Sequence, residues 1–252
     1  MQRQNEEAHS KRVAITFTEN RGHLHKPPIM QPTASTPTTA DEARDQRPAA
    51  IITLPKCIIR RYARTDDQAV TYHSNNPLIP RFMGNAFPYP NELADAQYWI
   101  NKCLEDPNGY EFVIADPIDG TAIGGIGLKT TPAKEINALS WGIGYWLGQE
   151  HWGKGIITEA LTNLIDWAFE GIIVETHDGG KWGLQRLYAE VMQGNTASMA
   201  VLGRCGFTLE GIERRSRIKH GVILDQHVFG ITRDDWEASK MAKSSEETTK
   251  AQ

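Results

Sequence analysis

The sequence predicts a mixed α/β (α+β) domain, and three observations lead to this fold class. Short segments in which apolar side chains alternate with small or polar ones, such as 140–147, have the period of β-strands. Residues 156–171 instead carry their apolar side chains at helical spacing. Glycine, proline and asparagine separate such segments, and the chain has no long repeat. Short strands and helices are therefore expected to follow one another in one domain.

The elements are expected in the order β-α-α-β-β-β-α-β-α-β-β. The strands are expected at 56–62, 111–116, 121–128, 138–147, 186–192, 207–210 and 222–232. The helices are expected after the N-cap candidate Thr65, from Asn91 to residue 106, at 156–171 and at 196–204. The turn 117–120 predicts a hairpin between its flanking strands, and 172–185 is expected to be a loop.

Two glycines lie where the strand 138–147 leads into the helix 156–171. A helix N-terminus carries unpaired N–H groups and a partial positive charge, so it attracts anions. Gly153 and Gly155 would let a phosphate approach the backbone, because glycine has no Cβ in the way. Lys154 adds a full positive charge between them. The stretch therefore predicts a site for a diphosphate or similar anion that is built mainly from backbone.

Several known glycine loops compete for this stretch. Gly148-x-x-x-x-Gly153-Lys154 has the spacing of a P-loop, but Gly155 stands where that loop needs Ser or Thr to hold magnesium. A dinucleotide-binding fingerprint needs a third glycine, and Thr158 occupies that position. An acyl-CoA loop is a third interpretation, and a turn whose glycines serve geometry alone is the fourth.

The acyl-CoA interpretation is carried by a family resemblance. The segment 150–155, EHWGKG, resembles the loop Gln/Arg-x-x-Gly-x-Gly/Ala of the GNAT N-acetyltransferases, although Glu150 stands where that family usually has Gln or Arg. Further motifs follow in the family's order: Gly144-Tyr-Trp-Leu147, Thr158-Glu-Ala160, Asn195-x-x-Ser198, Gly206-Phe207, and Asp225 ahead of 230–236. The span from Lys56 to Trp236 thus resembles the GNAT superfamily. More narrowly, it resembles the RimJ/RimL-like branch of ribosomal-protein N-terminal acetyltransferases.

The resemblance implies a mixed, mainly antiparallel central sheet flanked by helices, in one GNAT domain over residues 55–236. It also implies acetyl-CoA as the acetyl donor. The pantetheine arm is expected between the splayed strands 138–147 and 186–192, and the pyrophosphate on the amides of the glycine loop. On this basis the cofactor-binding residues are expected to be Tyr145, Trp146, Leu147, Trp152, Gly153, Lys154, Gly155, Ile156, Thr158 and Asn195.

Acetyl transfer to an amine needs a base for the amine and an acid for the leaving thiolate. Many relatives use a Tyr on the helix before Gly-Phe as the acid, but that position is Leu202 here. In the RimL-like branch a Ser and a Glu have been assigned such roles. Ser198 matches the Ser, whereas Arg217 stands at the Glu position. Glu190 is a substitute base, as is ordered water. Purely structural roles are the alternative. Ser198 and Asn195 would then cap or pack within the helix, and Glu190 would face solvent.

The composition indicates what to expect of the two ends of the chain, its partners and its compartment. Residues 1–54 are rich in Pro, Thr and Ala and are expected to be a disordered N-terminal extension, whereas 237–252 is expected to be a polar C-terminal tail. The start lacks the apolar core of a signal peptide. The formal net charge of -4 gives no bias towards nucleic acid or membranes, and no apolar run is long enough to span a bilayer. Three cysteines without paired spacing favour a reduced, cytoplasmic protein.

No metal site is expected. His151 has no partner at a recognisable spacing, and His23 and His25 are expected to lie in a solvated tail. The sequence therefore favours an N-acetyltransferase, monomeric or homodimeric, whose acceptor is a primary amine. A protein N-terminus is the favoured acceptor by resemblance, and a small amine is the competitor. A catalytically silent acyl-CoA-binding module is the alternative. The loops 76–92 and 212–224 are expected to build the acceptor pocket.

Overall fold

The computed structural model describes residues 47–106 and 108–250 of the chain. Its strands are β1 Ala50–Thr53, β2 Ile58–Arg60, β3 Glu111–Ala115, β4 Ala122–Lys129, β5 Ser140–Leu147, β6 Ile173–Glu175, β7 Lys181–Gly183, β8 Arg186–Met192, β9 Thr208–Lys219 and β10 Val222–Thr232. Its α-helices are α2 Asp67–Ser74, α3 Leu93–Glu105, α4 Ile156–Gly171, α5 Thr196–Arg204 and α6 Arg233–Lys250. Three 3₁₀ turns complete it: η1 Arg64–Asp66, η2 Pro80–Phe82 and η3 Gln149–His151.

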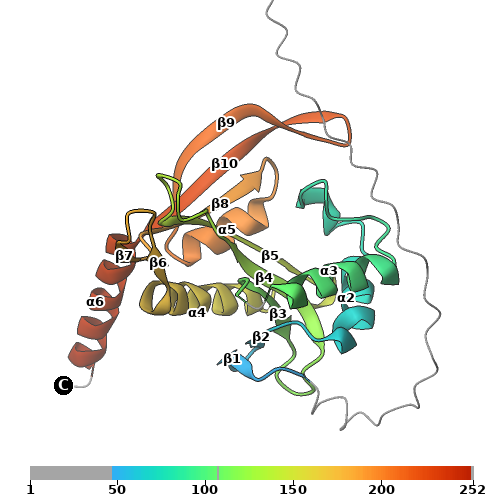
Figure 1. Cartoon of the computed structure of the whole chain (residues 1–252), viewed down its shortest axis with the longest axis horizontal. Coiled ribbons are helices and arrows are strands. Elements are labelled where there is room, and N and C mark those ends of the chain that lie inside the picture. Colours follow the sequence, from blue (N-terminus) through green and yellow to red (C-terminus); the bar gives the residue numbers. More distant parts are fainter. Residues whose placement is uncertain (1–46, 107, 251–252) are drawn as a thin grey trace, which may run out of the picture. The chain divides into compact units, whose positions relative to one another are not determined.

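Most of these strands form one mixed sheet in the order β1-β2-β3-β4-β5-β8-β10-β9 (Figure 1). Every neighbouring pair in it is antiparallel except β5 and β8, which are parallel. The short strands β6 and β7 form a separate hairpin within the segment expected as a loop. The predicted fold class, a mainly antiparallel sheet flanked by helices, is confirmed.

The parallel pair at the centre of the sheet is short. β5 and β8 are joined from Ser140↔Arg186 to Gly142↔Tyr188 only, whereas β5 stays paired with β4 as far as Leu147. β8 instead follows β10, with which it pairs along its whole length. The two central strands therefore diverge, as the family resemblance implies. The later edge of β5 is not covered by a strand of the described residues.

Different helices cover the two faces of the sheet. In β3, Phe112 and Ile114 belong to the larger apolar cluster, while Val113 and Ala115 belong to a smaller one. The larger cluster contains the buried side of α4, whose fully buried leucines each contribute about 1.5–3 kcal/mol relative to exposure. The smaller cluster contains Val70 of α2 and residues of α3, two helices that lie side by side in Figure 1. Side chains on the two faces of β5 thus meet different surroundings.

The sheet begins earlier than the sequence predicts. Ala50–Thr53 lies within the extension 1–54 that was expected to be disordered, but it forms β1 and pairs with β2. Ile51 and Ile52 pack against the larger core cluster, which stabilises this strand. Four residues are too few for a period of two to be visible in a proline-rich and threonine-rich context. Residues 1–46 of the expected extension lie outside the described residues.

Two further expectations are wrong at the C-terminal end. Residues 212–224 are not a loop, because β9 continues to Lys219 and β10 starts at Val222, with His220 and Gly221 at positive φ in the turn. Charged side chains and a bulge with Arg215 at φ 55° hide the strand pattern. Residues 240–252 were expected to be frayed, but those up to Lys250 belong to α6. Trp236 Nε1 donates to the Asp166 carboxylate of α4 (2.6 Å), which holds this helix on the domain.

None of the helices within the described ranges is both long and apolar enough to cross a bilayer.

Candidate active site

The glycine loop ends in an uncapped helix N-terminus. Gly155 is the N-cap of α4 with φ 76°, and Gly153 has φ 72°. L-residues with a Cβ avoid this region of φ, so the two glycines are needed for the backbone conformation itself. No side chain caps the helix start, and the Ile156 side chain is buried in the core. The geometry is that of an anion site.

Two lysines supply positive charge at this end of α4. Lys154 is exposed beside Gly155. Lys56, in the turn between β1 and β2, was missed. Its Nζ lies 3.0 Å from the point where a Cβ of Gly155 would stand. Its backbone N–H donates to Glu159 Oε2 of α4 (3.0 Å). Lys56 is distant in sequence, and only the β1–β2 pairing brings it here, so the sequence carries no local signal for it.

Trp152 and Thr158 tie the loop to its neighbours. The Trp152 Nε1 donates to the carbonyl oxygen of Leu147 (2.7 Å), where β5 ends. Main-chain groups near Tyr145 to Leu147 were expected to pair with pantetheine, and this carbonyl already accepts one hydrogen bond. The Thr158 carbonyl oxygen accepts from Cys205 Sγ (3.6 Å), which joins the first turns of α4 to the end of α5. The loop is thus fixed to both β5 and α5.

Along the uncovered edge of β5, successive side chains face opposite sides of the sheet. Trp146 packs with the smaller core cluster, and its ring lies 6.1 Å from that of Phe87. Tyr145 packs against the larger cluster together with Met199 of α5. The three predicted positions Tyr145, Trp146 and Leu147 therefore share one strand edge but present their side chains to two different environments.

The structure brings Tyr145 and Ser198 together. The two side-chain oxygens lie 2.8 Å apart, so the hydroxyls share a hydrogen bond. Asn195 caps α5, and its Oδ1 accepts from the Ser198 N–H (3.2 Å), so Asn195 has the capping role considered for it. Burial raises the pKa of the Tyr145 phenol to about 12, against a smaller lowering by the hydrogen bond to Ser198. Tyr145 was predicted to bind the cofactor through its backbone alone. The GYWL motif gives no indication that its hydroxyl pairs with that of Ser198.

Leu202, at the position of the acid in many relatives, is fully buried in the larger core cluster. Its side chain has a packing role and cannot donate a proton. The hydroxyl of Tyr145 is a phenol that contacts α5, and it comes from a strand instead of the helix.

Glu190, the predicted base, lies on the other face of the sheet. Leu187, Ala189 and Val191 of β8 are in the larger core cluster, so the alternation of the strand directs Glu190 away from Ser198. Its carboxylate pairs with Arg217 of β9 (3.3 Å), which also contacts Glu213 (3.4 Å). The arginine at the family's glutamate position thus engages the candidate base directly.

The segment between α2 and α3 closes over this second face. Lys219, at the end of β9, is buried, and its Nζ donates to the Met83 carbonyl oxygen (2.8 Å). A Cβ on Gly194, after β8, would touch the Phe82 ring. The predicted acceptor loop 76–92 therefore lies next to the hairpin of β9 and β10 and to the strand that carries Glu190.

The fold and the glycine loop are those of an acetyltransferase domain. The family model described as Acetyltransferase (GNAT) domain matches residues 56–208. The chain therefore belongs to the GNAT acetyltransferase family, as the resemblance of its motifs indicates.

Curated relatives carry N-acetyltransferase names. The chain is 35% identical over 132 residues to the probable N-acetyltransferase YjcK of Bacillus subtilis (strain 168). The alignment covers 52% of this chain and 66% of that protein. It is 26% identical over 148 residues to the ribosomal protein uS5 alanine N-acetyltransferase of Escherichia coli (strain K12). That alignment covers 59% of this chain and 70% of that enzyme.

Solved structures share the fold. The ribosomal-protein-S5-alanine acetyltransferase from Vibrio fischeri matches with a TM-score of 0.58 and 21% identity, over 73% of this chain and 97% of that one. RimL, a ribosomal L7/L12 α-N-protein acetyltransferase in complex with coenzyme A, matches with a TM-score of 0.59 and 20% identity. The match covers 74% of this chain and 99% of that one.

Proposed function

We propose that this protein transfers an acetyl group from acetyl-CoA to a primary amine, by direct attack of the amine in a ternary complex. One observation carries the proposal. The edge of β5 that β8 leaves uncovered runs into the uncapped, glycine-bearing N-terminus of α4. A peptide-like pantetheine arm needs such an edge, and a pyrophosphate needs such a helix end.

The proposed cofactor contacts follow the chain. The pyrophosphate is held by the amides from Trp152 to Ile156, with Lys154 and Lys56 adding charge. The pantetheine amides pair with main-chain groups of Tyr145 and Trp146, whereas the Leu147 carbonyl is occupied by Trp152. A backbone N–H on this edge would stabilise the thioester oxygen as negative charge develops on it.

The hydroxyl pair is proposed as the acid of the reaction. The amine nitrogen bonds to the thioester carbon, the C–S bond breaks, and the amine loses one proton while the sulfur gains one. The Tyr145 O–H can donate to Ser198 Oγ (2.8 Å) or to the Ser198 carbonyl oxygen (3.5 Å). When it donates to Oγ, the serine O–H is left to donate towards the sulfur. A phenol whose pKa is raised to about 12 keeps its proton at neutral pH. Asn195 orients Ser198 by capping its helix.

A protein N-terminal α-amine is the proposed acceptor class. The Glu190 carboxylate is paired with Arg217 and lies on the face of the sheet away from Ser198, so it is not placed beside the hydroxyl pair as a base. An α-amine titrates roughly 2 pH units below a lysine side chain and needs less help to lose its proton at neutral pH. The names of two relatives, both ribosomal-protein alanine N-acetyltransferases, support the same class.

Release of free CoA thiol, measured with a panel of amines, tests the proposal. The panel contains peptides with free Ala, Ser or Met N-termini, the same peptides N-acetylated but with an internal lysine, spermidine and an amino sugar. Turnover is expected with the free N-terminal peptides and not with the blocked ones. Calorimetry shows whether acetyl-CoA binds. Binding without thiol release from any acceptor would overturn the enzymatic proposal and leave a module that only binds acyl-CoA.

A further inference from the structure

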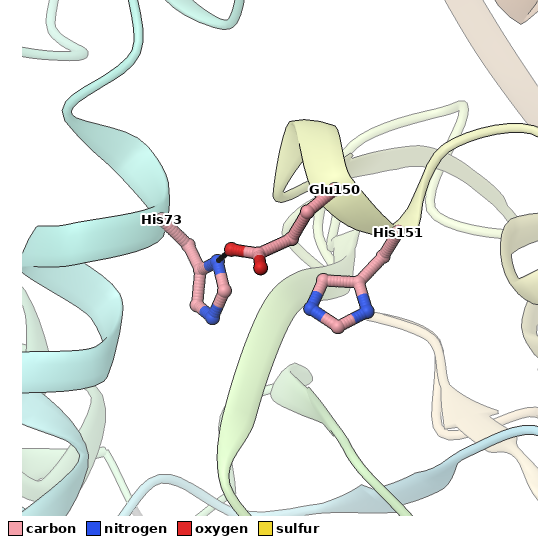
Figure 2. A group of neighbouring side chains, drawn as sticks. All are labelled: His73, Glu150 and His151. Atoms are coloured by element: carbon pink, nitrogen blue, oxygen red, sulfur yellow. Dashed lines mark ion pairs between the residues drawn. The ribbon is translucent and has the colours of Figure 1, made fainter.

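Three side chains that the proposed reaction does not use converge beside the glycine loop. His73 comes from the last turn of α2, whereas Glu150 and His151 belong to η3, directly before Trp152. Figure 2 shows the Glu150 carboxylate between the two imidazole rings. The His73 Nδ1 lies 3.2 Å from Glu150 Oε1, and one ligand atom from each of the three residues lies within 4.8 Å of the others. His151, expected to be exposed and without a partner, is half-buried, with its ring centroid 5.2 Å from that of His73.

The surroundings of this cluster are built to hold it. His73 is buried, and its Nδ1 would lie only 2.5 Å from a Cβ at position 148, so Gly148 makes room for the imidazole. The Asn76 Nδ2 donates to Gln149 Oε1, a second link between the end of α2 and η3. Glu150 is half-exposed, which leaves the cluster open to water on one side.

We propose that His73, Glu150 and His151 bind a divalent transition metal ion, zinc in particular, with water as the fourth ligand. Two imidazoles and one carboxylate suit zinc, whereas calcium and magnesium prefer oxygen ligands alone. Ligand atoms around a tetrahedral zinc are roughly 3.3 Å apart, from bond lengths near 2.0–2.1 Å. The His73–Glu150 pair already has this spacing, and small rotations of the exposed side chains bring His151 to it.

The site accounts for the residue that departs from the family loop. Glu150 stands where Gln or Arg is usual, and a carboxylate there has the same sign of charge as the proposed pyrophosphate and would repel it. A metal ion neutralises Glu150 and ties α2 to the segment that leads into Gly153. Metal binding itself does not depend on the proposed function. Its expected consequence, tighter binding of acetyl-CoA, rests on that function.

Zinc titration of the full chain against a chromophoric chelator tests the site, after metal removal by dialysis. About one tightly bound equivalent is expected, and zinc should raise the thermal midpoint by a few degrees. Cobalt at the same site should give the intense visible bands of a tetrahedral complex. His151→Ala should weaken zinc binding roughly 100-fold, and Glu150→Gln at least 10-fold, because each removes one ligand from the ion. Both changes affect partly exposed side chains, so folding is retained.

Two matched controls separate this cluster from other histidines. His177→Ala removes an exposed histidine of the β6–β7 hairpin, and a double His23→Ala, His25→Ala variant removes the pair near the N-terminus. Both should bind zinc like the parent. Zinc binding that survives His151→Ala, or that disappears in the double variant, would overturn the proposed site.

Acetyl-CoA calorimetry with and without zinc tests the consequence separately. Zinc should tighten acetyl-CoA binding several-fold in the parent and not in His151→Ala. Equal affinity in both conditions would refute the link to the loop. Because the zinc titration uses neither acetyl-CoA nor an amine, failure of the metal site and failure of the proposed function give different results.

Discussion

The two sides of the diverging strands are built in different ways. The loop side, residues 147–171, is one continuous stretch of chain in which backbone groups and two glycines at positive φ form the proposed pyrophosphate site. The hairpin side is assembled from the segment 75–92, β8 and the β9–β10 hairpin. It is held by side chains that are distant in sequence, such as Lys219 with Met83 and Arg217 with Glu190.

This difference separates what is general from what is particular in the protein. A pyrophosphate is the same in every acyl-CoA, and a helix N-terminus meets it without any special side chain. An acceptor differs from enzyme to enzyme, so its site depends on side chains from several elements. Changes on the loop side should therefore affect acetyl-CoA binding, and changes on the hairpin side should affect the acceptor.

The largest effect is expected for Gly155→Asp. The new Cβ would stand 3.0 Å from Lys56 Nζ, and the carboxylate would occupy the proposed pyrophosphate position. Acetyl-CoA binding should weaken by about 100-fold or more, about 2.7 kcal/mol, measured by calorimetry. Gly179→Asp is the matched control, because Gly179 also has positive φ but lies in the β6–β7 hairpin. Parent-like binding by a folded Gly155→Asp protein would remove the main support for the acyl-CoA site.

Loss of the hydroxyl pair should lower turnover and spare cofactor affinity. Tyr145→Phe and Ser198→Ala each remove one hydroxyl and should lower kcat roughly 10- to 100-fold, since a hydrogen bond to a charged group contributes about 1.5–3 kcal/mol. The double variant should be little worse than either single one, because the two groups act as a unit. The measurement is the steady-state rate of thiol release, with acetyl-CoA affinity as the control. An unchanged kcat in both single variants would exclude the pair from the reaction.

On the hairpin side a smaller effect is expected, on the KM for the acceptor instead of on acetyl-CoA binding or kcat. Lys219→Met keeps the length of the side chain but removes the bond to the Met83 carbonyl. The segment 75–92 should be held less firmly, and the acceptor KM should rise about 5-fold, near the 1 kcal/mol of an average hydrogen bond. The KM for acetyl-CoA should stay unchanged. Lys181→Met, at an exposed lysine of β7, is the control. A change in the acetyl-CoA KM alone would contradict the division into two sides.

The smallest expected effect is that of alkaline pH on Tyr145. Burial raises its pKa to about 12 from the ordinary value of 10. The stability that this phenol contributes is therefore complete below about pH 10 and is lost between about pH 10 and 12. The rate should rise as the acceptor amine loses its proton and then stay level to about pH 10. A pH–rate profile of the parent and Tyr145→Phe measures this. A fall below pH 10 in the parent alone would show that Tyr145 titrates lower.

The parts of the site that lie within one stretch of chain were predictable. Glycine at 153 and 155, the start of α4 and the end of β5 follow from local periodicity and local chirality. Lys56 and the partners of Glu190 were not predictable, since they meet through sheet pairing. The extent of β9 was missed because charged residues on an edge strand give no apolar alternation.

By itself the sequence determined the fold class, the strand–loop–helix unit and the acetyltransferase family, because these depend on interactions between residues close along the chain and on motifs that keep their spacing. Only the tertiary structure decided that Tyr145 meets Ser198, that Arg217 engages Glu190 and that His73 faces Glu150 and His151. Each of these contacts joins different elements of the fold. Their distances depend on strand divergence and helix packing, which no single stretch of sequence encodes.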